Sequence, residues 1–312
     1  MNIVVFGPAR RVGVLDGDRI IDLNATDAEL PPTLLPLIEL GRNGKNRIAK
    51  AVAQMRGVAV DGSKVLAAGG IGLHAPWAGK RVACAGGNYA EHSYGMAINR
   101  GTKDITLEKM SAQIRAAGNW GFWKVLAEAA GPGTEIPYPS RADYFDYEGE
   151  VAIVIGKRGK NIPAEQLGDY VWGVTLANDW SNRDSGGPAR AMSFNLPKNF
   201  DLSLSLGPSI AIDGVDPQNV DVETRVNGAL RQRYNSRDMV FSFAEYLAFL
   251  SIDFTFVPGD VILGGTGAGT AQDSTKPNAD GTRPRELFLK KGDTVAISSP
   301  SIGTLENRIG GS

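Results

Sequence analysis

The sequence contains one cysteine, two histidines and no long apolar run, and each shortage excludes a class of protein. A lone Cys84 can form neither an intramolecular disulfide nor a cysteine-based zinc site. No apolar run approaches the roughly 20 residues of a membrane-spanning helix, and the N-terminus lacks the pattern of a secretory signal. We therefore expect a soluble, cytoplasmic protein that does not associate with membranes.

The chain also lacks an excess of charge of either sign. Its 33 basic and 34 acidic side chains leave a formal net charge of -1 over 312 residues. This balance gives no electrostatic footprint for nucleic acid or for an anionic membrane surface. Hydrophobic residues make up 42% of the chain, which is enough for a sizeable core.

Apolar spacing and turn signals predict an α+β fold that is rich in strands. Short strands within 1–23 and helices within 33–55 indicate a small N-terminal α+β domain, residues 1–78. Long connections separate the strands of a larger domain, 79–312, so we expect mixed, curved β-sheets that enclose a site. The strands predicted there are 81–85, 150–156, 171–178, 208–213, 221–227, 260–264 and 294–299, and the helices are 164–168 and 241–252.

Residues 97–122 form an unusually long connection within the larger domain. They contain a predicted amphipathic helix at about 105–116. A connection of this length inside a compact domain is often a lid or a binding loop. The alternative is an inserted surface helix that has no role in the site.

Glu148 and Glu150 stand at the start of a strongly apolar run, 151–155. Alternate residues of a strand share a face, so both carboxylates would point the same way beside a dry core. Repulsion and lost hydration would raise their pKa values unless a cation lies between them. If the strand that ends at Asp179 is a neighbour, a third carboxylate joins the pair.

Three carboxylates suit a hard divalent ion such as Mg²⁺, Mn²⁺ or Ca²⁺. Such a cation would remove the repulsion and the desolvation problem together. The alternative is a solvated strand end with an ion-paired Asp179.

An ordered set of motifs from about residue 80 to 310 resembles the fumarylacetoacetate hydrolase family. The central pair is "DYEGEVAIVIGKRGKNI" followed by "GVTLANDWSNRD". The others are "GGNYAEHSYGM", "KVLAEAAGPGTEIPYP", "PKNFDLSLSLGPSI", "PGDVILGGTGAGT" and "LKKGDTVAISSPSIGTLENRI". The resemblance implies a metal-dependent enzyme that acts on a small-molecule 2-keto acid and is commonly a homodimer.

The resemblance also implies a role for individual residues. Lys198 would polarise a substrate oxygen, and backbone amides in the glycine turn at Gly265 would form an anion cradle. The implied sets are the metal ligands Glu148, Glu150 and Asp179 (Mg²⁺, with Mn²⁺ or Ca²⁺ as alternatives), the catalytic residues His92 and Lys198, and the substrate-binding residues Gly265, Thr266 and Arg183.

The chain departs from the family pattern beside His92. Family members often carry a glutamate three residues after this histidine, where it orients the imidazole as a general base, but this chain has Gly95. Either another acid takes its place, with Glu91 and Glu108 as candidates, or the reaction needs no activated water.

Two further departures point to an atypical substrate pocket. Gly267 stands where a proline usually follows the threonine, which would loosen the turn. The segment 185–187 replaces one that often supplies a substrate-contacting glutamine. Arg183 and Asp184 remain, as expected support for Asp179.

The first functional hypothesis is a hydrolase that cleaves a C–C bond in an acylpyruvate or 2,4-diketo acid through a metal-stabilised enolate. The missing glutamate keeps open an alternative, a lyase or isomerase (dehydratase, decarboxylase or tautomerase) acting on a 2-keto-3-deoxy acid or related enol. A second alternative is a metal-binding member that has lost catalysis.

Overall fold

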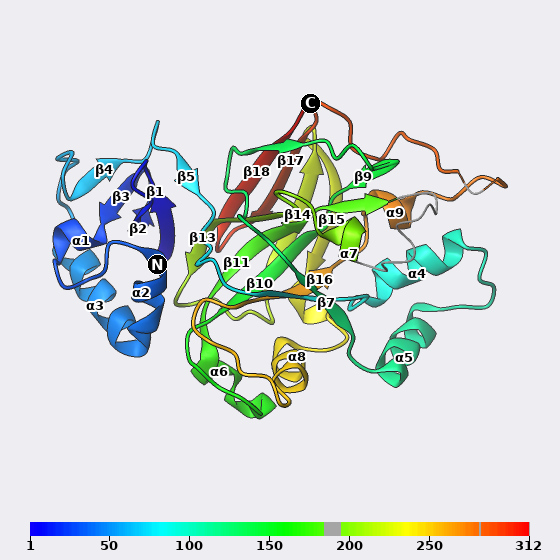
Figure 1. The fold of residues 1–312 in the computed structure, drawn as a ribbon, viewed down its shortest axis with the longest axis horizontal. Coiled ribbons are helices and arrows are strands. Elements are labelled where there is room, and N and C mark those ends of the chain that lie inside the picture. Colours follow the sequence, from blue (N-terminus) through cyan, green and yellow to red (C-terminus); the bar gives the residue numbers. More distant parts are fainter. Residues whose placement is uncertain (184–194, 281, 312) are drawn as a thin grey trace.

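A computed structural model describes residues 1–183, 195–280 and 282–311 of the chain. Figure 1 shows a long molecule with the N-terminal segment, in blue, at one end. Helices α4 (Ala90–Asn99) and α5 (Leu107–Ala117) lie at the opposite end. The strand-rich α+β fold predicted from the sequence is confirmed.

The N-terminal segment is an antiparallel meander of strands with helices packed on it. Gly17, in the turn between the second and third strands, has a φ of +62°, and Gly41, at the start of the third helix, has a φ of +55°. Leu37 and Ile48 on the helices share one hydrophobic cluster with Val12 on the sheet. The elements are β1 (Asn2–Phe6), β2 (Arg11–Asp16), β3 (Arg19–Asp22), α1 (Leu23–Thr26), α2 (Leu34–Glu39), α3 (Gly41–Gln54), β4 (Val65–Ala67) and β5 (Leu73–His74).

One sheet runs through most of the molecule. Within the described residues it has 11 strands, in the order β4-β3-β2-β1-β13-β11-β10-β16-β6-β7, with β5 paired to β1. Because β1 pairs antiparallel with β13, the N-terminal segment continues directly into the rest of the sheet. The division into domains 1–78 and 79–312 stays a prediction. The other members are β6 (Val82–Ala85), β7 (Gly121–Lys124), β10 (Gly149–Ile155), β11 (Val171–Asp179), β13 (Leu204–Ala211) and β16 (Val261–Thr266).

Strand β10 is buried on both of its faces, as its apolar sequence predicts. Ala152 and Val154 belong to the hydrophobic cluster that reaches the N-terminal segment. Val151, Ile153 and Ile155 point the other way, into a second cluster. This alternation fixes which face of the sheet each neighbouring carboxylate can reach.

A smaller sheet of five strands, counted over the described part of the chain, covers the second face of β10. Its order is β15-β14-β17-β18-β8. Val222 on β14 and Ile297 on β17 join the second cluster beside Ile153, so the two sheets pack face to face. The members are β8 (Glu135–Pro137), β14 (Asp221–Val226), β15 (Ala229–Asn235), β17 (Thr294–Ser299) and β18 (Gly303–Gly310), and a separate ribbon pairs β9 (Tyr144–Asp146) with β12 (Ser181–Arg183).

Short helices close the ends of the sheets. Helix α8 begins with a capping box in which Ser242 and Glu245 satisfy each other's backbone amides. Thr106 caps α5, which confirms the helix predicted near 105–116. The remaining helices are η1 (Ala164–Gln166), α6 (Leu167–Tyr170), α7 (Asn195–Lys198), η3 (Ser236–Asp238), α8 (Phe243–Leu250) and α9 (Ala271–Ser274).

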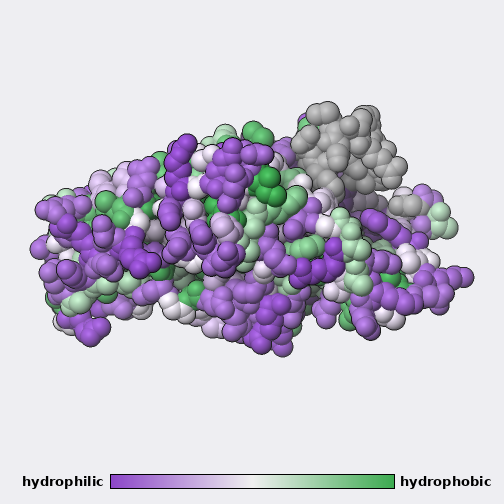
Figure 2. Space-filling view, turned by 90° about the horizontal axis from the view of Figure 1, so that it is seen from below, coloured by the Kyte–Doolittle hydropathy of each residue, from purple (hydrophilic) through white to green (hydrophobic). Residues whose placement is uncertain are grey.

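One face of the molecule is largely hydrophilic (Figure 2). On the face seen in Figure 2, hydrophobic side chains form small, separate groups among hydrophilic ones. Across the described ranges, no helix has the length and apolar character that crossing a membrane requires.

Candidate metal and catalytic site

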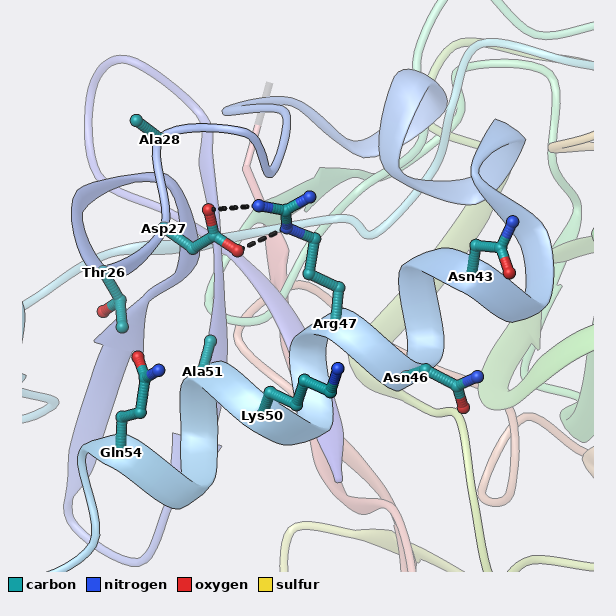
Figure 3. A pocket seen from close by; sticks show the side chains of 9 residues that line it. All are labelled: Thr26, Asp27, Ala28, Asn43, Asn46, Arg47, Lys50, Ala51 and Gln54. Atoms are coloured by element: carbon teal, nitrogen blue, oxygen red, sulfur yellow. Dashed lines mark hydrogen bonds and ion pairs between the residues drawn. The ribbon is translucent and has the colours of Figure 1, made fainter.

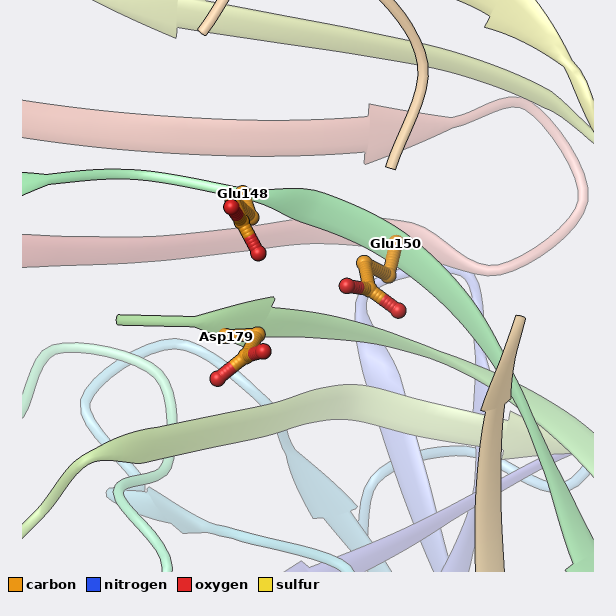
Figure 4. A group of neighbouring side chains, drawn as sticks. All are labelled: Glu148, Glu150 and Asp179. Atoms are coloured by element: carbon orange, nitrogen blue, oxygen red, sulfur yellow. The ribbon is translucent and has the colours of Figure 1, made fainter. Parts of the chain in front are cut away.

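Three buried carboxylates meet where β10 and β11 lie side by side. The two strands pair antiparallel, with Gly149 opposite Asn178, so Glu148 and Glu150 flank the end of β11 that carries Asp179. Figure 4 shows the three carboxylates turned toward one another. One oxygen from each lies within 4.8 Å of the others, and the residues are only 7%, 1% and 1% exposed. The predicted convergence of Asp179 with the glutamate pair is confirmed.

Lys198 lies directly against this cluster, at the end of α7. Its Nζ donates to Glu148 Oε2 at 2.5 Å, to Asp179 Oδ2 at 2.7 Å and to the Ser181 hydroxyl at 2.6 Å. Burial opposes its charge, but Asp179 and Glu148 raise the pKa of Lys198, so it remains an ammonium. The predicted active-site lysine is therefore beside the predicted metal ligands.

A second lysine, Lys124, also reaches the cluster, and the sequence analysis assigned it no role. Its Nζ donates to Asp179 Oδ1 at 2.5 Å and to the backbone oxygen of Lys198 at 2.6 Å. The side chain is completely buried at the end of β7. A lysine that ends an otherwise apolar strand, "GFWK", was the available signal.

Arg183 supports a different carboxylate from the one predicted. Its guanidinium donates to Glu148, and its Nε donates to Asp146 Oδ2 at 3.1 Å. The expected partner, Asp179, already receives both lysines. The predicted contributions of Asp184 and of 185–187 lie outside the described residues.

The surroundings of the two glutamates shift their pKa values in opposite directions. Burial alone would raise the pKa of Glu148, but Lys198 and Arg183, and after them His92, hold it well below its usual range. Burial, followed by the charges of Asp179 and Glu148, raises the pKa of Glu150 well above its usual value. Glu150 accepts a backbone amide, from Gly265 at 2.8 Å. Among the described residues no cationic side chain bonds Glu150 directly, and the charge of Lys198 does not offset its burial.

A divalent cation would supply positive charge beside Glu150. The donors are all carboxylate oxygens, which suits Mg²⁺, Mn²⁺ or Ca²⁺ more than a soft metal. Glu148, Glu150 and Asp179 would hold the ion, and Arg183 would orient Glu148 behind it.

Metal binding is expected to release protons at pH values above the ordinary glutamate range. Because the pKa of Glu150 is raised in the metal-free protein, the ion must displace its proton, and apparent affinity should increase with pH until Glu150 is ionised. Titration calorimetry with Mn²⁺ in two buffers of different ionisation enthalpy measures the protons released. Binding without proton release at every pH above the ordinary glutamate range would contradict the raised pKa of Glu150.

The end of β16 holds Glu150 and the neighbouring backbone of β10. The Thr266 hydroxyl donates to the Gly149 oxygen at 2.9 Å and accepts from Gln232 Nε2 at 2.7 Å. The Gly265 amide and the Thr266 hydroxyl therefore donate hydrogen bonds to other groups of the protein in this structure. Their role in substrate binding stays a prediction.

Gly267 lets an aromatic ring pack against the turn after β16, and the loosening expected from the missing proline stays a prediction. A Cβ at this position would lie 2.4 Å from the ring of Tyr234. The absence of a side chain lets the ring pack directly on the turn, and the Tyr234 hydroxyl donates to the Gly149 oxygen at 2.6 Å.

His92 has a carboxylate partner that the sequence analysis did not identify. Its Nδ1 lies 2.6 Å from Oδ2 of Asp273, on α9, and both side chains are buried. The candidates Glu91 and Glu108 are exposed instead. Glu91 directly precedes His92 on α4, and adjacent residues of a helix do not face the same way.

A second hollow, in the N-terminal segment, has no comparable chemistry. This groove of about 770 Å³ lies between α3 and the end of α1. Figure 3 shows Arg47 turned toward Asp27 in it, and Glu29 also pairs with Arg47. No carboxylate of the cluster lines the groove, so we place the functional site at the β10–β11 junction.

Comparison with known proteins relates most of the chain to one family. The family model described as Fumarylacetoacetate (FAA) hydrolase C-terminal matches residues 81–310. This range holds the three carboxylates, both lysines and the His92–Asp273 pair.

Relatives and solved structures match over nearly the whole chain. Oxaloacetate tautomerase fahd2 of Xenopus laevis is 32% identical over 99% of this chain and 90% of its own length. Oxaloacetate tautomerase YisK of Bacillus subtilis is 31% identical over 95% of each chain. The solved fumarylacetoacetate hydrolase of Exiguobacterium antarcticum is 28% identical, covers 100% of both chains and has a TM-score of 0.77.

Proposed function

Because the chain belongs to the fumarylacetoacetate hydrolase family, we propose that it is a divalent-metal-dependent tautomerase of a small 2-keto dicarboxylic acid, with oxaloacetate as the first candidate. The observation that carries the proposal is the full-length similarity to oxaloacetate tautomerases, combined with a carboxylate cluster beside a histidine. The relatives favour the isomerase alternative of the sequence analysis over the acylpyruvate hydrolase that it placed first.

A bound divalent ion, Mg²⁺ or Mn²⁺, would act as a Lewis acid that withdraws electrons from the keto-acid oxygens. Tautomerisation from enol to ketone removes a proton from the enol oxygen and adds a proton to C3, so no water is consumed. Lys198 is the ammonium placed to stabilise negative charge on the oxygen. His92, which lies near enough to Glu148 to influence the pKa of that carboxyl, would move the proton.

A positive region beside the site supports a substrate with a second carboxylate. Burial, and then the charges of Arg100 and Arg183, lower the pKa of Arg283. Arg283 donates to the backbone oxygen of Thr275 at 2.6 Å, directly after α9. Arg183 already pairs with Glu148 and Asp146, so Arg100 and Arg283 are the charges that would favour a dianion over a monocarboxylate.

The test follows enol oxaloacetate after dilution into buffer with the Mn²⁺-loaded or Mg²⁺-loaded protein. We expect faster loss of the enol's ultraviolet absorbance than in buffer with metal alone, and matching formation of the ketone measured with malate dehydrogenase. Protein stripped with chelator is the control.

Other products would assign the other functions. Cleavage of acetylpyruvate into acetate and pyruvate, without faster enol loss, would indicate the hydrolase, for which the His92–Asp273 pair could activate water. Pyruvate and CO₂ from oxaloacetate would indicate a decarboxylase. Metal binding without any of these activities would favour the non-catalytic alternative. The homodimer implied by the family stays a prediction for light scattering.

A further inference from the structure

The contact between His92 and Asp273 determines which nitrogen of the imidazole carries a proton. A carboxylate only accepts hydrogen bonds, so at 2.6 Å from Asp273 Oδ2 the Nδ1 of His92 must donate. The other nitrogen, Nε2, keeps its lone pair in the neutral ring. Both side chains are nearly sealed from solvent, at 8% and 3% exposed, so no water competes strongly for this contact.

Gly95 makes room for the contact. Helix α4 carries both His92 and Gly95, and Asn99 at its end donates to the Asp273 backbone oxygen at 2.6 Å. A Cβ at Gly95 would lie 3.0 Å from that oxygen and 3.2 Å from the Asp273 Cβ. Helix α9 therefore occupies the space that a side chain at position 95 would need.

Asp273 is itself held in place by the turn that follows β16. The Gly269 amide lies 3.1 Å from each carboxylate oxygen, and the Ser274 hydroxyl donates to Oδ1 at 2.9 Å. These donors leave Oδ2 directed at the imidazole. Glu150 and the partner of His92 are thus held by neighbouring backbone amides, of Gly265 at the end of β16 and of Gly269 in the turn after it.

We propose that Asp273 is the positioning residue of His92, fixing the Nδ1–H tautomer so that Nε2 exchanges the proton with the substrate, and that Gly95 is its steric complement. The carboxylate that relatives often carry on the histidine's own helix comes here from α9. The role of Nε2 rests on the proposed function, whereas the tautomer assignment does not.

The first test is the tautomer itself, read by NMR of ¹⁵N-labelled histidine. The chain has two histidines, and His74 provides an internal reference of the opposite kind because its Nε2 donates to the Gly7 oxygen at 2.8 Å. We expect one Nδ1–H and one Nε2–H imidazole in the neutral state. Two Nε2–H rings would overturn the proposal whatever the enzyme's substrate.

The second test is Asp273→Asn, which keeps the size of the side chain and can donate to Nδ1. We expect His92 to change to the Nε2–H tautomer and kcat to fall about 100-fold or more, with KM and Mn²⁺ affinity within about threefold. Asp280→Asn, an exposed change in the same connection, should alter none of these. Unchanged kcat with a changed tautomer would overturn the positioning role.

The third test moves the carboxylate back to α4. Asp273→Gly removes the charge and the Cβ that would lie 3.2 Å from a Cβ at position 95, and the backbone oxygen at 3.0 Å then has to shift by only a few tenths of an ångström. We expect the double variant Asp273→Gly, Gly95→Glu to recover about tenfold of the lost kcat. Melting curves identify variants that fail to fold, and the Asn variant then carries the test. If wild-type protein does not turn over oxaloacetate but His92 is Nδ1–H, the proposed function fails and the dyad stands.

Discussion

Replacing Lys198 by methionine is expected to tighten Mn²⁺ binding about tenfold while lowering kcat by about 100- to 1000-fold. The Lys198 ammonium bonds one oxygen of Glu148 and one of Asp179, so its charge opposes a cation that needs the same carboxylates. Removing it relieves that repulsion but leaves the substrate oxygen without its ammonium. Calorimetry and the enol assay measure the two effects on one preparation.

Lys124→Met is the matched control, because it also removes a buried ammonium from Asp179. Its Nζ contacts Asp179 and a backbone oxygen but not Glu148. We expect it to tighten metal binding as well, with a loss of kcat of only about tenfold. If metal affinity fell in the Lys198 variant, competition between the ammonium and the ion would be disproved.

The second large effect is the difference between two variants, Glu150→Gln and Asp179→Asn, each of which replaces one carboxylate of the cluster by an uncharged amide. Glu150→Gln should abolish the metal-induced rise in melting temperature and weaken metal binding more than about 100-fold, yet leave the metal-free protein folded. Asp179→Asn should destabilise the metal-free protein by about 3 kcal/mol, because two buried ammonium groups lose their charged partner. Denaturant unfolding with and without Mn²⁺ separates the variants.

The pH dependence of the metal-free protein gives a further distinction. The pKa of Glu150 is raised on folding, so the folded state binds this proton more tightly than the unfolded chain does. Its contribution to stability is present at low pH and is lost as pH rises from the ordinary glutamate range through the raised value. Glu150→Gln cannot ionise and should remove that loss. An unchanged pH profile in this variant would indicate that Glu150 is ionised without metal.

Local sequence was sufficient for the carboxylate cluster. Alternation along β10 and the end of β11 are properties of contiguous residues, so Glu148, Glu150 and Asp179 could be brought together from strand patterns and one assumed pairing. The strands predicted at 150–156 and 171–178 differ by one residue or less at each end from the strands found.

The remaining contacts depend on how distant elements pack. Asp273 lies 181 residues from His92 in the sequence, and only the packing of α9 on α4 makes them partners. Lys124 reaches Asp179 because β7 and α7 approach the same end of the sheet. No local pattern encodes either approach, so reasoning from the sequence looked for the histidine's partner among nearby glutamates.

The pairing of β1 with β13 has a mechanical consequence for the whole enzyme. β13 is also the neighbour of β11, and Leu204 on β13 lies opposite Asp179 itself. Deleting the first five strands would leave the long apolar strand β13 as an exposed sheet edge, which is a template for aggregation. It would also weaken the packing that supports Asp179, a proposed metal ligand. The N-terminal segment therefore stabilises the sheet that carries the site, although none of its side chains belongs to the carboxylate cluster.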